Sequence, residues 1–164
     1  MKSIKPEELN KTAFEMIGKD WMLVAANKDG KVNAMTASWG GFGVMWGKNV
    51  AFVFIRESRY TKEFVDAADE MSLSFFNEDY KKMLGYMGSV SGRDEDKISK
   101  AGLTLQGDGV PVFEEAALTM VCKKLYAAPM PEEGFVGTEE LEKWYKDRDY
   151  HTMYVVQIED IYTK

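Results

Sequence analysis

The sequence predicts a mainly β protein with short helices, arranged as an antiparallel β-barrel or sandwich with the helices in its connections. Six or seven segments have the composition of strands, and four have that of short helices. These segments do not alternate strictly, which argues against a doubly wound parallel sheet. Asp29-Gly30, between two strand-like segments, is typical of a tight β-hairpin turn. The 164 residues, 45% of them hydrophobic, suit one domain over residues 1–164 with a substantial core.

The first 39 residues predict a helix and a hairpin. Pro6 and the acidic residues after it suit a first helical turn, and helically spaced apolar residues continue to Ile17, where Gly18 ends the run. Residues 21–26 are an unbroken apolar run of strand length. Residues 32–39 are expected to return as the second strand after the turn.

The next segment begins with a loop and continues through two strands. The glycines of residues 40–43 predict the loop, and the β-branched and aromatic residues 49–56 predict a buried strand. A helix is expected to begin at Ser58 or Thr61. Residues 72–76 alternate in polarity as a strand does.

The second half of the chain continues this mixture of elements. Residues 79–86 and 95–101 predict two short helices, joined by the Gly- and Ser-rich residues 88–92. A long strand, a helix with a partial capping box and a closing strand are expected at residues 116–127, 138–145 and 153–161.

Composition excludes several classes of function. The net charge of −6 and pI near 5.0 make a nucleic-acid partner unexpected, because such proteins must neutralise phosphates. With Cys122 as the single cysteine and His151 as the single histidine, we expect neither a disulfide framework nor a metal site. The longest apolar runs have six residues, against about 20 for a membrane helix. The sequence therefore predicts a cytoplasmic protein without a membrane partner or a signal peptide.

Arginine is distributed unevenly along the chain. Of 21 basic residues only four are arginine, and Arg56, Arg59 and Arg93 fall in one stretch. Guanidinium groups that gather in an acidic protein suit a bound anion. The alternative interpretation is a chance cluster on a solvated face.

Three segments are candidates for chemistry. Residues 33–41 carry small and hydroxylated side chains where a strand would usually carry bulky ones, which leaves room for a flat ligand. Residues 56–61 place arginines and hydroxyls at a helix start, which suits a phosphate group. Residues 88–97 offer a flexible loop with hydroxyls and cations, a weaker signal. The alternatives are an edge strand with a solvated face, an ordinary helix cap and an ordinary surface loop.

Two lone side chains have mainly structural interpretations. His151 lies at the head of the last predicted strand, and a single histidine is more often structural than catalytic. Cys122 lies within an apolar strand with no histidine beside it, so we expect a core residue.

The order and spacing of these segments together resemble the flavin reductase-like family, whose fold is an FMN-binding split β-barrel. The resemblance extends over nearly the whole chain. It is carried by residues 33–40, 53–56, 59–61, 91–94, 96–97, 101–103, 149–151 and 153–154.

The resemblance implies a set of cofactor-binding residues. Those expected beside the flavin ring are Thr36, Ala37, Ser38 and Trp39. Those expected at the phosphate end are Arg56, Ser58, Tyr60 and Thr61, with Ser91 and Lys97 completing the site. No catalytic residue is required, because the flavin carries the redox chemistry. His151 is the one weak candidate, for nicotinamide contact or proton relay.

The implied function is that of a flavin reductase-type oxidoreductase, with NAD(P)H as co-substrate. Hydride or electrons would pass from NAD(P)H to FMN and on to an acceptor. The alternative is a flavoredoxin-like FMN electron carrier that does not oxidise NAD(P)H directly and meets a redox protein partner through its acidic surface. A relative of pyridoxamine-phosphate oxidases is less well supported by the motifs. The family resemblance and the large apolar content both predict a homodimer.

Overall fold

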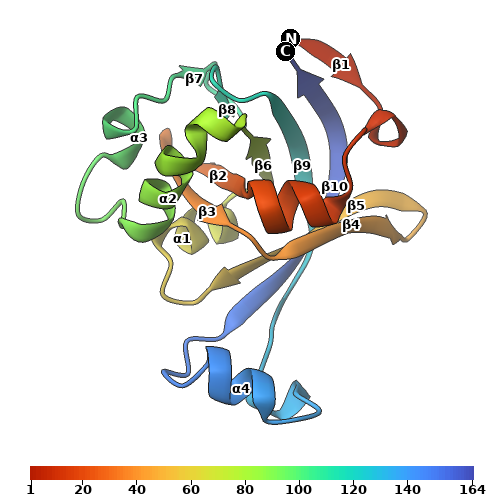
Figure 1. Cartoon of the computed structure of the whole chain (residues 1–164), viewed down its shortest axis with the longest axis vertical. Coiled ribbons are helices and arrows are strands. Elements are labelled where there is room, and N and C mark those ends of the chain that lie inside the picture. The colour runs from red at the N-terminus through yellow and green to blue at the C-terminus, as the bar shows by residue number, and fades with distance from the viewer.

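Ten strands and eight helical segments make up the protein in the computed structural model, which describes residues 1–164 (Figure 1). The strands are β1 (Lys2–Ile4), β2 (Met22–Lys28), β3 (Lys31–Ala37), β4 (Gly40–Met45), β5 (Lys48–Arg56), β6 (Glu70–Phe75), β7 (Leu105–Gln106), β8 (Val112–Phe113), β9 (Leu118–Pro129) and β10 (His151–Thr163). The helical segments are η1 (Pro6–Glu8), η2 (Phe14–Asp20), α1 (Tyr60–Ala67), η3 (Glu78–Tyr80), α2 (Lys81–Ser89), α3 (Lys97–Lys100), η4 (Glu132–Gly134) and α4 (Glu139–Trp144).

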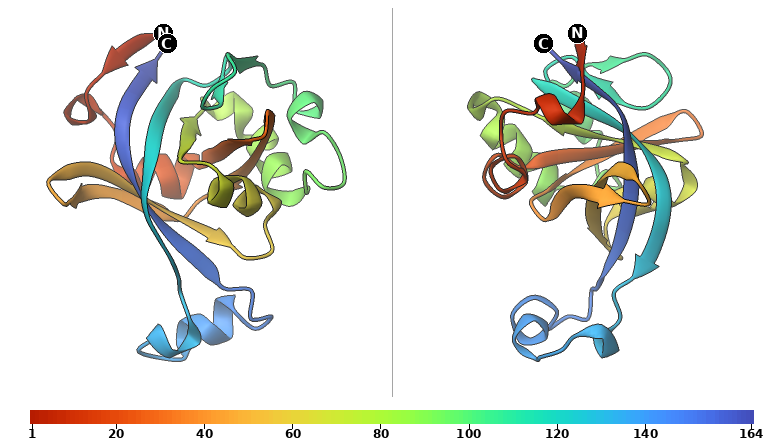
Figure 2. Two further views of the ribbon diagram at one scale, coloured as in Figure 1. Left: turned by 180° about the vertical axis from the view of Figure 1, so that it is seen from behind. Right: turned by 90° about the vertical axis from the view of Figure 1, so that its right-hand side faces the viewer.

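Eight of the strands form one antiparallel sheet. The hydrogen-bonded order is β3-β2-β6-β9-β10-β5-β4, and β1 pairs with the end of β10, which brings the two termini together (Figures 1 and 2). The path ends at β3 and β4, which the chain joins directly through Ser38 and Trp39. The predicted class, mainly β and antiparallel with short helices, is confirmed.

The apolar residues form two clusters, one on each face of β2. Met22 and Val24 belong to a cluster of 21 buried residues, while Leu23 and Ala25 belong to a second cluster of 10. The second cluster lies beneath α2, whose Leu84 is among its members. The unbroken apolar run in β2 follows from this burial of both faces.

The single helix predicted from Pro6 to Ile17 is wrong. A short 3-10 turn, η1, ends at Leu9 in extended backbone, and the π-helix η2 follows with Gly18 inside it. Leu9 and Ile17 still pack on the larger core cluster. The helical spacing of apolar residues therefore identifies side chains that pack on the core, but it does not identify a continuous helix. The start of the chain instead pairs as β1 with β10.

The loop predicted at residues 40–43 is also wrong, since these glycines lie in strand β4. Gly40 has a φ of +152°, and a Cβ there would lie 2.5 Å from the carbonyl oxygen of Phe52. The predicted loop at residues 88–92 begins too early, because α2 continues through Ser89. A Cβ at Gly88 would lie 3.2 Å from Cβ of Thr36. Close approach of neighbouring backbone and side chains accounts for both glycines.

Residues 130–150, called the insertion below, connect β9 to β10. They carry η4 and α4 and project away from the barrel at the lower end of Figure 1, as Figure 2 also shows. Tyr145 is the one buried residue among them. No helix in the structure combines the length and apolar character needed to cross a membrane.

Candidate functional site

Two adjoining cavities collect the predicted site residues. The polar cavity has a volume of about 280 Å³, and the aromatic cavity beside it about 270 Å³. Met35, Arg56 and Arg59 line both. Of the predicted residues, the polar cavity is lined by Arg56, Ser58, Tyr60, Thr61, Ser91 and Lys97. The aromatic cavity is lined by Thr36, Ala37, Ser38, Trp39, Arg56 and His151.

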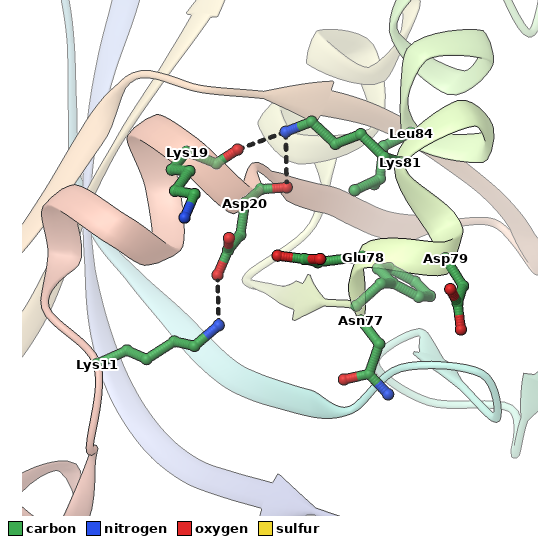
Figure 3. Close-up of a pocket in the computed structure, with 9 residues that line it drawn as sticks. Lys11, Lys19, Asp20, Asn77, Glu78, Asp79, Lys81 and Leu84 are labelled. Atoms are coloured by element: carbon green, nitrogen blue, oxygen red, sulfur yellow. Dashed lines mark hydrogen bonds and ion pairs between the residues drawn. The ribbon is translucent and has the colours of Figure 1, made fainter.

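The largest cavity, about 750 Å³, lies elsewhere, between η2, η3 and the start of α2 (Figure 3). Two of its lysines are bonded to neighbouring protein groups. Lys11 and Asp20 form an ion pair at 2.7 Å, and the Lys81 ammonium donates to the backbone carbonyls of Lys19 and Asp20. None of the predicted site residues lines it.

The cations of the polar cavity are held by backbone carbonyls. Lys97 is buried and donates to the carbonyls of Met87 at 2.8 Å and Val90 at 2.9 Å. Burial, with a smaller contribution from the nearby positive charge of Arg59, lowers the pKa of Lys97 to about 8. Arg59 itself donates to the Gly88 carbonyl at 2.7 Å. These bonds fix both positive groups in the wall of the cavity.

Arg93 closes the rim of the polar cavity. Its guanidinium lies 4.7 Å from the centre of the Tyr60 ring and pairs with the Glu63 carboxylate. It also donates to the Ser58 carbonyl at 3.2 Å. Arg56, Arg59 and Arg93, which the sequence grouped in one stretch, line one cavity.

Arg56 connects the cavities to the insertion. Its guanidinium donates to the carbonyls of Asp149 at 2.7 Å and Trp144 at 3.0 Å, and it lies 5.2 Å from the centre of the Tyr145 ring. Two of its five N–H groups are used in these bonds. Arg56 therefore anchors the insertion as well as lining both cavities.

A carboxylate lies where the sequence predicted a bound anion. Asp149 accepts the backbone N–H of Ser58 at 3.0 Å and the Ser58 hydroxyl at 2.5 Å. Asp149 also lines the polar cavity. In this arrangement Ser58 donates to the protein rather than into the cavity.

The aromatic cavity is walled by rings in mutual contact. The Trp39 ring lies 4.9 Å from His151 and 5.0 Å from Trp144, measured between centroids. His151 Nδ1 is hydrogen-bonded to the Tyr145 hydroxyl at 2.8 Å. Burial, followed by the positive charge of Arg56, lowers the pKa of His151 to about 4. The imidazole is therefore neutral at pH 7.

The small residues of β3 lie between helix α2 and the aromatic cavity. The Thr36 hydroxyl donates to the Leu84 carbonyl of α2 at 2.6 Å, so it is engaged by the protein. Ala37 is buried, and Ser38 is exposed beside the cavity. The small side chains of β3 thus serve the packing of α2 on one face and border the cavity at the strand's end.

Several lining residues were not among the expected cofactor-binding residues. They include Asn33, Met35, Arg59, Arg93, Trp144 and Asp149. The arginine cluster was a usable signal for Arg59 and Arg93. No pattern in the sequence marked Asp149, because its partner Ser58 lies 91 residues away in the chain.

Comparison with known proteins identifies similar chains. The model of the flavin reductase like domain matches residues 16–164. No curated protein matches the chain. The structure of flavoredoxin from Methanosarcina acetivorans is similar with a TM-score of 0.70 and 21% identity, covering 100% of this chain and 76% of that one.

Two further structures show the same fold. An FMN-binding domain of a flavin reductases-like enzyme from Shewanella baltica has a TM-score of 0.69 and 16% identity, with 99% of this chain and 76% of that one covered. Flavoredoxin of Desulfovibrio vulgaris has a TM-score of 0.69 and 21% identity, with 100% and 77% covered. At these identities the likeness establishes the split-barrel fold.

Proposed function

The chain belongs to the flavin reductase-like domain family, and from that premise we propose that it is an FMN-binding oxidoreductase that takes hydride or electrons from NAD(P)H and passes them to an acceptor. The observation that carries this proposal is the pair of adjoining cavities. One is cationic and the other aromatic, and they share Met35, Arg56 and Arg59. A single ligand with a phosphate at one end and a flat ring at the other suits both.

The polar cavity fits a phosphate ester. It is lined by four cationic side chains, Arg56, Arg59, Arg93 and Lys97, against the one carboxylate of Asp149. The first turn of α1 adds N–H groups that lack partners within the helix. Among the predicted phosphate ligands, Ser58 could donate to a phosphate only after its hydrogen bonds to Asp149 break. Thr61 and Lys97 make no bond to Asp149 and need no such change. One such cluster favours FMN over FAD, which carries a second phosphate and an adenine.

The aromatic cavity fits the ring end of the flavin. Ala37, Ser38 and Trp39 would border the ring, and Trp39 is held in place by His151 and Trp144. When bound, the flavin supplies the redox chemistry, and the protein supplies binding and orientation. The neutral His151 imidazole acts through its contact with Trp39, so we assign it an orienting role rather than that of a proton donor.

The experiment that tests this function is anaerobic mixing of the purified, flavin-loaded protein with NADH and with NADPH. The proposal predicts FMN as the flavin released on denaturation and rapid bleaching with at least one nicotinamide. A dominant FAD peak would contradict the cofactor assignment. If only a reduced protein donor reduces the bound FMN, the alternative of a flavoredoxin-like electron carrier is favoured. The structural likeness to two flavoredoxins supports that alternative.

We also propose that the protein is a homodimer. Large apolar side chains are exposed on the β4–β5 hairpin, on β9 and on the insertion, namely Val44, Trp46, Tyr126, Val136 and Trp144. The Trp46 and Tyr126 rings lie 6.4 Å apart, so the hairpin and β9 contribute to one patch, and a contiguous exposed apolar patch is typical of an association surface. Light scattering should return twice the monomer mass of 18.6 kDa at micromolar concentration, and the monomer mass would refute the dimer.

The setting that we propose is the cytoplasm, with a redox protein as an acceptor. Cys122 is a free, buried thiol, which suits a reducing compartment. The net charge of −6 suits electrostatic docking to a basic partner. Weaker electron transfer to the acceptor at raised ionic strength would support such docking.

A further inference from the structure

Two buried polar side chains meet in the wall of the polar cavity. Asn33 of β3 donates through Nδ2 to the hydroxyl oxygen of Thr61 in the first turn of α1, at 2.8 Å. Asn33 is 4% exposed and Thr61 is 1% exposed, and both line the cavity. A hydrogen bond between two such buried groups fixes their relative orientation.

The direction of this bond determines what Thr61 can do. A hydroxyl has one proton to donate and two lone pairs to accept with. Since the Asn33 amide donates to the oxygen, the Thr61 proton is left for another acceptor, and no atom of the chain accepts it. A buried hydroxyl proton without an acceptor beside a cationic cavity suits a ligand oxygen.

The other side of the Asn33 amide, with its oxygen, faces Gly92. A Cβ at residue 92 would lie 2.0 Å from Oδ1 and 3.0 Å from Cγ of Asn33. The amide therefore packs directly against the Gly92 backbone on one side and Thr61 on the other. An amide turned by half a rotation would present its oxygen to Thr61 and accept the proton that now faces the cavity.

We propose that Asn33 is a positioning residue that makes Thr61 a donor to the phosphate of the ligand, and so contributes to the choice of FMN over riboflavin. The inference rests on the proposed function, because it assigns the polar cavity to a phosphate. It adds a residue that does not touch the reacting ring and acts through Thr61 alone. Thr61, by contrast, would contact the phosphate directly.

The test is a double-mutant cycle with Asn33→Leu and Thr61→Val, in which the affinities for FMN and riboflavin are measured by flavin fluorescence. Each single variant should weaken FMN binding by about 2- to 13-fold, the range of one neutral hydrogen bond, and leave riboflavin unchanged. In the Thr61→Val background, Asn33→Leu should cost little more, because the residue through which it acts is gone. Additive losses, or equal losses for both flavins, would overturn the inference.

Gly92→Ala provides a second route that keeps both polar side chains. The added methyl group should displace the Asn33 amide and weaken FMN but not riboflavin, and the loss should shrink when Asn33 is Ala. Gly109→Ala is the matched control, because a Cβ there meets nothing within 4 Å. Thermal melting confirms that each variant folds.

The outcomes separate this inference from the proposed function. A wild-type protein that binds FMN no better than riboflavin overturns both. A preference for FMN that survives Asn33→Leu and Gly92→Ala overturns the role of Asn33 and leaves the proposed function standing.

Discussion

The polar and aromatic cavities lie side by side but are built from different interactions. In the polar cavity, Arg59 and Lys97 are fixed by bonds to backbone carbonyls, and the nearby Thr61 is fixed by Asn33. In the aromatic cavity, the rings of Trp39 and Trp144 contact one another and are 37% and 44% exposed. On the proposed function, the held cations would recognise the phosphate, and the more exposed aromatic end would leave room for a second molecule beside the ring.

The largest expected effect is at Arg56, which belongs to both cavities. Arg56→Ala should weaken FMN by roughly 1.5–3 kcal/mol, or about 10- to 150-fold, because a charged donor to the phosphate is lost. Riboflavin should lose much less. Flavin fluorescence titration measures both affinities, with Arg148→Ala as the control, since Arg148 is 75% exposed and lies outside both cavities.

Arg56 also anchors the insertion, so its removal can loosen residues 130–150. Thermal melting of Arg56→Ala shows whether the fold is retained. If both flavins weaken equally, or neither does, Arg56 does not bind the phosphate and its part is to hold the insertion.

The next effect is a pH dependence of stability that arises from His151 in the aromatic cavity. The pKa of His151 is lowered to about 4, so the unfolded chain binds more protons than the folded chain between that value and the ordinary pKa near 6.5. Stability therefore rises with pH through this window. Lowering the pH from 7 to 5 should reduce the free energy of unfolding by about 2 kcal/mol.

Urea unfolding at the two pH values measures this change. His151→Phe should flatten the dependence, since the chain has no other histidine. A variant with the same slope as the wild type would show that other groups produce it.

A smaller effect is expected at Trp39. Trp39→Ala should weaken FMN and riboflavin by the same factor, about 2- to 13-fold, because an aromatic contact of 0.5–1.5 kcal/mol is lost at the ring end. The ratio of the two dissociation constants is the decisive quantity. A change in that ratio would mean that the two cavities do not divide ring from phosphate as proposed.

The smallest effect is expected at Arg93, on the exposed rim. Its side chain is 46% exposed and already pairs with Glu63, so Arg93→Ala should weaken FMN by only about 1.4- to 5-fold. Titration at low and high NaCl should show the loss fading as salt screens the charge. A loss as large as that of Arg56→Ala, or one insensitive to salt, would place Arg93 among the direct phosphate ligands.

Much of this protein could be predicted from local sequence. The hairpin at Asp29-Gly30, the buried strand β5 and the helix after it follow from turn chemistry and residue type, and all are present. The small residues of β3 and the arginines near β5 also marked the two segments that border the cavities. These features depend on neighbours close in the chain, which the sequence displays directly.

The tertiary structure alone decided how those residues are used. Because β5 and β10 pair with Arg56 opposite His151, Arg56 meets Asp149 across 93 residues of chain, and Asp149 in turn occupies the donors of Ser58. In the same way the packing of α1 against β3 allows the Asn33 amide to orient Thr61. The sequence determined which chemical groups are present and where the β2–β3 hairpin turns. Which proton faces the cavity depended on contacts between distant segments, because strand register sets those contacts and local composition does not record it.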